Sequence, residues 1–166
     1  MNAFLIWLES TTFSAWVRES PSVFAFPAIL SCHTVGMGLV AGINAALALR
    51  ILGVGPDIPL IEMKRFSPVM WFGFWLNAAS GVVLLIGYPT KALTNPVFYL
   101  KLALIAAGVS IVILLDRRLF RERMLTDDAT SREVRMLAVA SLLSWGGAIT
   151  AGRLLAYTYT RLMAIA

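Results

Sequence analysis

Four segments of this chain are each long and apolar enough to cross a lipid bilayer. A transmembrane helix needs about 20 predominantly apolar residues, and residues 23–52, 66–88, 97–115 and 134–163 meet this requirement. Charged residues make up only 14% of the chain, against about 25% in soluble domains. We therefore expect a single all-α domain over residues 1–166, an integral membrane four-helix bundle in which short connections make successive spans antiparallel.

The residues before the first span predict a short helix that lies in the membrane interface. Residues 1–20 mix aromatic and aliphatic side chains with Glu9, Arg18 and Glu19, and Pro21 follows them. This mixture suits the boundary between lipid headgroups and acyl chains. A signal peptide has a basic start, then an apolar core, then a cleavage site of small residues. This segment lacks that succession, so we do not expect it to be a signal peptide.

The basic residues predict how the bundle is oriented. Nine of them lie in or beside the connections after the first and third spans, against three at the opposite end. Cytoplasmic connections carry an excess of basic residues, so in a bacterium we expect an inner-membrane protein with both termini periplasmic. The net charge of +5 is attributed to this topology, and no nucleic acid is expected as a partner. The nine residues are Arg50, Lys64, Arg65, Arg117, Arg118, Arg121, Arg123, Arg132 and Arg135.

Each span carries a polar residue among apolar neighbours. The only histidine of the chain is His33, in the first span, while Lys101 lies in the third and Arg153 in the fourth. Because the spans alternate in direction, these three side chains are predicted to converge in the outer half of the bundle. Neither cation has an acidic residue within its span to neutralise it, and an ionised group inside a membrane is costly. We therefore expect Lys101 and Arg153 to meet either an anionic ligand or the headgroup region.

Haem b would use these types of residue. Haem is a flat group that binds iron through an imidazole nitrogen and carries two propionates that need cations. The leading hypothesis is a haem-b-binding or redox-associated subunit with His33 as ligand and Gly36 leaving room beside it. Lys101 and Arg153 would then pair with the propionates. With a single histidine in the chain, the iron would be five-coordinate, would use Met70, or would lie between two subunits.

Copper is the alternative metal. Imidazole and thioether groups suit Cu(I), and His33 and Met37 lie about one helical turn apart. Cys32 points about 100° away from His33 around the helix, so it is not expected to join them. The chain contains no motif of serine hydrolases, zinc proteases, P-loop enzymes or dinucleotide-binding enzymes, and no catalytic residue is assigned.

A third hypothesis gives the chain a structural or assembly role in a membrane complex or a homodimer, besides its contact with lipid. Gly38 and Gly42 have the GxxxG spacing that allows close contact between helices, and Asn44 and Asn77 suit hydrogen bonds between helices. The histidine would then bond a backbone carbonyl and have no further function. The tryptophans expected to form contacts are Trp71, Trp75 and Trp145.

Three stretches resemble known membrane proteins. FSAWVRESPSVFAFPAILSCHTVGMGLVAGINAALALRILGVG (residues 13–55) and AGRLLAY (residues 151–157) are similar to a family of small bacterial inner-membrane proteins of unknown function. NPVFYLKLALI (residues 95–105) resembles the third span of copper-resistance D-type membrane domains. The resemblance implies a four-helix bundle related to those domains and, more distantly, to membrane cytochromes b. It also implies that His33 and Lys101 are functional positions.

Overall fold

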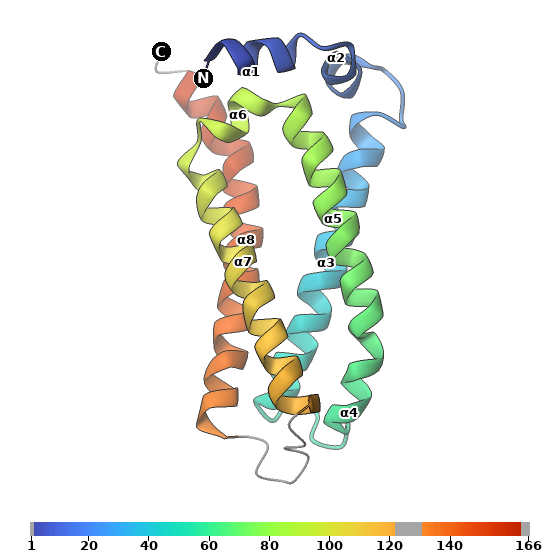
Figure 1. The fold of residues 1–166 in the computed structure, drawn as a ribbon, viewed down its shortest axis with the longest axis vertical. Helices are drawn as coiled ribbons and strands as arrows, with labels where there is room; N and C mark the ends of the chain where they lie inside the picture. The colour runs from blue at the N-terminus through green and yellow to red at the C-terminus, as the bar shows by residue number, and fades with distance from the viewer. Residues whose placement is uncertain (1, 122–130, 164–166) are drawn as a thin grey trace.

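The computed structural model describes residues 2–121 and 131–163, and every regular element in these ranges is helical. Four long helices form an antiparallel bundle (Figure 1), which confirms the all-α four-helix bundle predicted from the sequence. The helices are α1 (Asn2–Glu9), α2 (Thr12–Glu19), α3 (Phe26–Ile51), α4 (Leu60–Met63), the 3₁₀ turn η1 (Lys64–Phe66), α5 (Ser67–Gly87), α6 (Pro89–Leu93), α7 (Pro96–Asp116), the π-helical turn η2 (Arg117–Arg121) and α8 (Arg132–Met163).

The two ends of the bundle carry different elements. Helices α1, α2 and α6 lie at one end together with the end of α8, and we call this the terminal end (Figure 1). The connection through α4 and η1, the turn η2 and the start of α8 lie at the other end, which we call the basic end. Eight of the nine clustered basic residues belong to the described part of the chain, and Arg123 lies outside it.

Local sequence signals explain where the long helices begin. A proline lies in the first turn of each of α3, α5 and α7, where its missing N–H removes no helical hydrogen bond. Asn95 caps α7, because its side-chain oxygen accepts a hydrogen bond from the Val97 amide at 2.9 Å. Its side-chain nitrogen donates to Thr158 Oγ1 at 2.9 Å, which ties the start of α7 to α8. The four long helices agree with the predicted spans to within three residues at each end.

The backbones of α3 and α5 approach closely at two glycines. A Cβ atom on Gly36 would lie 2.7 Å from both the Asn77 amide nitrogen and the Gly73 carbonyl oxygen. Gly38 and Gly42 instead face open space, with no atom within 4 Å of an added Cβ. Within the described chain, the close contact of α3 is therefore made at Gly36 and not at the GxxxG pair. Gly36, which was expected to leave room for a cofactor, is packed against the backbone of α5.

Helices α7 and α8 form the second close pair. A Cβ atom on Gly108 would lie 2.9 Å from Cε2 of Trp145, and one on Gly147 would lie 3.1 Å from Cδ1 of Leu104. Trp145 is buried in this contact. The bundle thus consists of two close pairs, α3 with α5 and α7 with α8, and α3 packs against α8 to join them.

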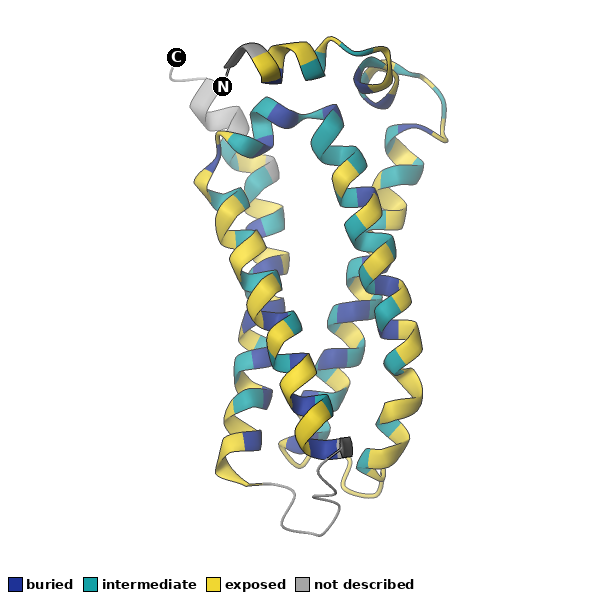
Figure 2. Cartoon of the chain, in the orientation of Figure 1, coloured by how far each residue is buried: buried dark blue, intermediate teal, exposed yellow. Residues whose placement is uncertain are grey.

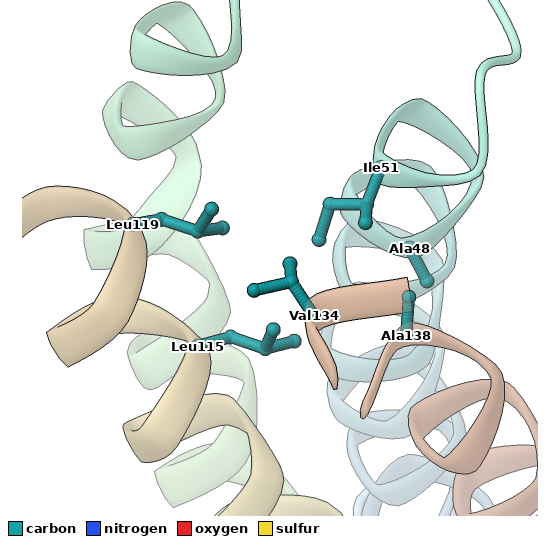
Figure 3. Close-up of a cluster of buried hydrophobic side chains, with 6 residues drawn as sticks. All are labelled: Ala48, Ile51, Leu115, Leu119, Val134 and Ala138. Carbon is teal, nitrogen blue, oxygen red and sulfur yellow. The ribbon is translucent and has the colours of Figure 1, made fainter. Parts of the chain in front are cut away.

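At the basic end the two pairs are joined by buried aliphatic side chains. Figure 3 shows these side chains converging from α3, from α7 and η2, and from α8. Each is at most 5% exposed, so this end of the bundle has a continuous apolar core. The six residues are Ala48, Ile51, Leu115, Leu119, Val134 and Ala138.

At the terminal end, α2 docks on the end of α5. Val17 is fully buried, and its Cγ1 atom would lie 2.8 Å from a Cβ on Gly87. Ser14 is also fully buried, and its hydroxyl donates to the Ile86 carbonyl oxygen at 3.0 Å. The Arg18 guanidinium donates to the Gly87 carbonyl oxygen at 3.3 Å. The amphipathic start of the chain therefore forms two short helices, of which α2 is anchored to the bundle by Ser14, Val17 and Arg18.

The long helices have the length and surface of membrane spans. Four helical stretches of the described chain are long and apolar enough to cross a bilayer: Phe26–Ile51, Leu60–Gly87, Pro96–Leu119 and Arg132–Leu155. Exposed residues run along the outside of the bundle (Figure 2). Among them Phe72, Trp75 and Leu143 are between 62% and 70% exposed. Exposed apolar surface of this extent indicates contact with lipid, and the chain is an integral membrane protein.

Replacing Gly36 with alanine is expected to weaken the contact between α3 and α5, because the added methyl group would meet backbone atoms. Overpacking of this kind destabilises a protein by about 1–3 kcal/mol. Gly38→Ala is the matched control, since its methyl group would meet no atom within 4 Å. Thermal denaturation in detergent should give a lower melting temperature for Gly36→Ala only. Equal melting temperatures for the two variants would show that the close contact is not at Gly36.

Candidate functional site

His33, on α3, is held in place by α5. Its Nδ1 atom lies 3.0 Å from the Asn77 carbonyl oxygen. In return, the Asn77 side-chain amide donates to the His33 carbonyl oxygen at 2.7 Å. Ser80 Oγ lies 3.3 Å from the same Nδ1 atom. These bonds link the backbone of each helix to a side chain of the other, so they fix the imidazole relative to both helices.

The contacts of the two ring nitrogens favour a proton on Nδ1. A carbonyl oxygen only accepts hydrogen bonds, so Nδ1 is the donor. The Asn77 side-chain amide also lies 3.3 Å from Nδ1, but it donates to the closer His33 carbonyl oxygen at 2.7 Å. The Ser80 hydroxyl does not compete for this role, because it donates to the Leu76 carbonyl oxygen at 2.6 Å. A neutral imidazole protonated at Nδ1 has a free lone pair on Nε2. The structure therefore presents Nε2 of His33 as the acceptor or ligand atom.

Nε2 of His33 faces the side chain of Lys101, which comes from α7. Lys101 Nζ lies 3.4 Å from this nitrogen. An ammonium group has only donors, so the contact agrees with an unprotonated Nε2. No ion pair between described residues involves Lys101. The lysine thus meets an imidazole where a buried cation usually meets a carboxylate.

Two glycines leave room for this pair of side chains. A Cβ atom on Gly81 of α5 would lie 3.1 Å from Cε1 of His33. One on Gly152 of α8 would lie 3.7 Å from Cε of Lys101. The imidazole therefore packs against the backbone of α5, and the lysine lies along the backbone of α8.

The pair lies in the half of the bundle nearer the terminal end. His33 is seven residues after the start of α3, or about 10 Å along the helix axis. Lys101 is five residues after the start of α7, or about 8 Å along it. Both helices begin at the terminal end (Figure 1). The structure thus brings two of the three predicted nitrogen-bearing side chains together, and we call His33, Asn77, Ser80 and Lys101 the His33 cluster.

The structure does not add the other predicted haem-binding residues to this cluster. Arg153 follows Gly152, but its side chain is exposed and has no hydrogen bond or ion pair with a described residue. Met70 is buried on α5, seven residues before Asn77 and so about 10 Å nearer the basic end. Met70 is therefore placed away from the ring of His33.

The predicted copper ligands lie on one helix. Met37 is half-buried one turn after His33, and Cys32 is exposed. The described residues contain no group of three or more histidine, cysteine, aspartate or glutamate side chains that could hold a metal ion. A copper site in the described chain would thus consist of His33 and Met37.

Two neighbours of the histidine were not assigned to the site from the sequence. Ser80 and Gly81 lie on the turn of α5 that follows Asn77, and the helical repeat places residues 77 and 81 on one face. Asn77 does hydrogen-bond between helices, as predicted. A hydrogen bond between helices was also predicted for Asn44. Its amide nitrogen instead donates to the Val40 carbonyl oxygen of the same helix at 2.8 Å.

Comparison of the chain with protein-family models, with curated proteins and with solved structures finds no match.

The tautomer of His33 can be measured directly, because this is the only histidine in the chain. Protein labelled with ¹⁵N-histidine is expected to give one pair of ring resonances, with the proton on Nδ1 and none on Nε2. Lys101→Met should shift the Nε2 resonance more than the Nδ1 resonance, since only Nε2 faces the lysine. Ser110→Ala is the control, because its hydroxyl bonds within α7 and is exposed. A proton found on Nε2 in the unmodified protein would contradict the arrangement.

Proposed function

We propose that this integral membrane protein binds haem b through Nε2 of His33 and acts as a redox-associated subunit. The observation that supports the proposal is the orientation of the ring, in which Nδ1 donates to the Asn77 carbonyl oxygen at 3.0 Å. Histidines that bind metals commonly donate their second ring N–H to such an acceptor, which fixes the tautomer and strengthens the ligand nitrogen. The lone pair of Nε2 is then available to iron.

Lys101 supports the proposal as a cation without a carboxylate partner among the described residues. A propionate would supply the missing anion. The lysine stem is flexible and lies against Gly152, so the ammonium group can turn from Nε2 to a nearby anion. Arg153, next to Gly152 in the sequence, would be the second cation. Haem b, when bound, supplies an iron that gains and loses one electron.

In this proposal His33 is the only residue of the described chain that would bind the iron. Gly36 is packed against α5, and Met70 is about 10 Å along α5 from Asn77. The iron would therefore be five-coordinate or would lie at a contact with a second subunit. Exposed aromatic side chains on α5, such as Phe72 and Trp75, offer a surface for a homodimer or a larger complex.

Copper handling and a structural role are the competing functions. Copper would be held by His33 and Met37, in line with the resemblance to copper-resistance D-type domains. In a structural role, the hydrogen bonds between His33 and Asn77 would only hold α3 against α5. Haem is preferred because it gives a function to both Nε2 and the cation beside it, whereas a copper ion would bring no anion for the ammonium group that lies 3.4 Å from Nε2.

Protein purified from haem-replete cells is expected to show a Soret absorption band that His33→Ala removes. Cys32→Ala is the matched control, since this neighbour is exposed and does not contact the ring. Lys101→Met should weaken haem binding by a factor of about ten or more, the amount expected for one hydrogen bond to a charged group. Absorption spectra during haem titration of each variant provide the measurement.

Two outcomes would reject the haem proposal. A colourless protein that contains copper by elemental analysis, and loses it in Met37→Ala, would favour copper handling. A protein without haem or copper, whose partners and stability do not change in His33→Ala, would favour the structural role.

We also propose that the basic end faces the cytoplasm of a bacterium and that both termini face the periplasm. Exposed basic residues at this end include Arg65, Arg117, Arg118 and Arg132. At the opposite end, Arg18 is used internally, with its guanidinium bonded to backbone carbonyl groups of α1 and α5. The excess of basic residues at the basic end therefore supports this orientation under the positive-inside rule, which counts lysines and arginines.

Reporter fusions test the orientation. Alkaline phosphatase, which is active only in the periplasm, is expected to be active when fused after residue 166 and inactive when fused in the connection between α3 and α4. Green fluorescent protein should give the opposite pattern. Phosphatase activity at the connection would show that the basic end lies outside.

A further inference from the structure

A cavity of about 220 Å³ lies at the basic end, far from the His33 cluster. Its walls come from the parts of α3, α5 and α7 nearest the basic end, from α4, and from the turns η1 and η2. The volume is below the range of about 300–1,000 Å³ for sites that enclose a whole small molecule. It suits a ligand of which only a part is buried.

The cavity lies on the side of the bundle where the two helix pairs are not closely packed. Helix α5 packs on α3, α7 packs on α8, and α3 packs on α8, but α5 and α7 share no contact of similar extent. Met70 and Trp71 of α5 face Val112 and Ile113 of α7 across the cavity. Because α5 and α7 are both spans, this apolar part of the cavity is at the level of the acyl chains.

The mouth of the cavity is charged. Lys64 and Arg117 line it together with Asp116 and the hydroxyl-bearing Ser67. Two cations and one carboxylate leave this lining with an excess of one positive charge. From Met63, at the mouth, to Met70 is seven residues, or about 10 Å along a helix. The site is therefore polar and positive at one end and apolar for about half the length of an acyl chain.

We propose that this cavity binds an anionic phospholipid of the leaflet at the basic end. The phosphate would meet Lys64 and Arg117, with Ser67 as a further hydrogen-bond donor. The part of one acyl chain nearest the headgroup would lie between α5 and α7. A neutral lipid would make no use of the excess positive charge of the lining. A free anion would leave the apolar walls empty. An anionic phospholipid satisfies both parts of the cavity at once.

Native mass spectrometry of the full-length protein with equal amounts of phosphatidylglycerol and phosphatidylcholine tests this proposal. The unmodified protein is expected to retain phosphatidylglycerol preferentially. The double variant Lys64→Gln/Arg117→Gln should lose the preference, by a factor of roughly five for each cation, as expected for a basic residue near an anionic headgroup. The matched control is Arg65→Gln/Arg118→Gln, which removes the same charge from the same end. These two arginines pair with Glu62 and Glu133 and do not line the cavity.

Two further measurements separate a lipid from other sources of negative charge. Ile113→Trp adds bulk to the apolar wall at an exposed position and should lower retention of phosphatidylglycerol without changing the melting temperature. Inorganic phosphate in excess should not displace the lipid. Equal losses in the two double variants, equal retention of the two lipids, no effect of Ile113→Trp, or displacement by phosphate would each overturn the proposal. These variants leave the His33 cluster intact, so the result does not depend on whether haem binds.

Discussion

The close approach of α3 and α5 is the constraint on which the candidate site depends. Gly36 and Gly73 lack side chains, and this lets the two backbones come within a distance that a single Cβ atom would prevent. Only at this separation can an imidazole on α3 reach a backbone carbonyl of α5 and an asparagine on α5 reach a carbonyl of α3. The helix contact and the orientation of His33 are thus consequences of one packing arrangement.

The two helix pairs are joined differently at their two ends. At the basic end, six aliphatic residues from α3, α7, η2 and α8 form a tightly buried core (Figure 3). In the half nearer the terminal end, the contact between His33 and Lys101 connects α3 and α7. An aliphatic core loses free energy if it is opened, whereas a lysine can exchange one partner for another through rotation of its side chain. The two ends of the bundle therefore differ in kind: an aliphatic core joins the pairs at one end, and a polar contact with an adaptable side chain joins α3 to α7 nearer the other.

Much of the fold could be predicted from the sequence, because the membrane imposes strong requirements on length and polarity. The spans and their ends followed from the apolar runs alone. The contacts between helices could not be predicted in this way. The sequence pattern does not distinguish a glycine at a helix contact from one that faces open space. Gly38 and Gly42 have the spacing of a packing motif but face open space, while Gly36 and Gly73 make the contact. Which glycine lies at the helix contact depends on how each helix is rotated about its axis. The faces of an almost entirely apolar helix differ little in polarity, so the sequence does not determine this rotation.

The candidate site was predictable in part for a related reason. Ionisable residues are rare in membrane spans, so His33, Lys101 and Arg153 could be identified from the sequence alone. Whether such residues meet depends on both helix rotation and side-chain length. His33 and Lys101 do meet, while Arg153, one residue beyond the glycine that faces Lys101, has an exposed side chain. One step along a helix turns a side chain by about 100°, and this is enough to separate a residue that lies in the bundle from one that lies on its surface.

The absence of a carboxylate beside Lys101, among the residues that the structure describes, is the property of the cluster that most needs a functional explanation. A protein that needed only to join α3 to α7 could do so with apolar side chains, as it does at the basic end. Placing an ammonium group and an imidazole together in a span is costly, because neither neutralises the other. Under the proposed function, an anion would accompany the group that binds Nε2, and this would offset the cost. Haem b has both features in one molecule, with an iron for the imidazole and propionates for the lysine, and this pairing is the reason to prefer it over a bare metal ion.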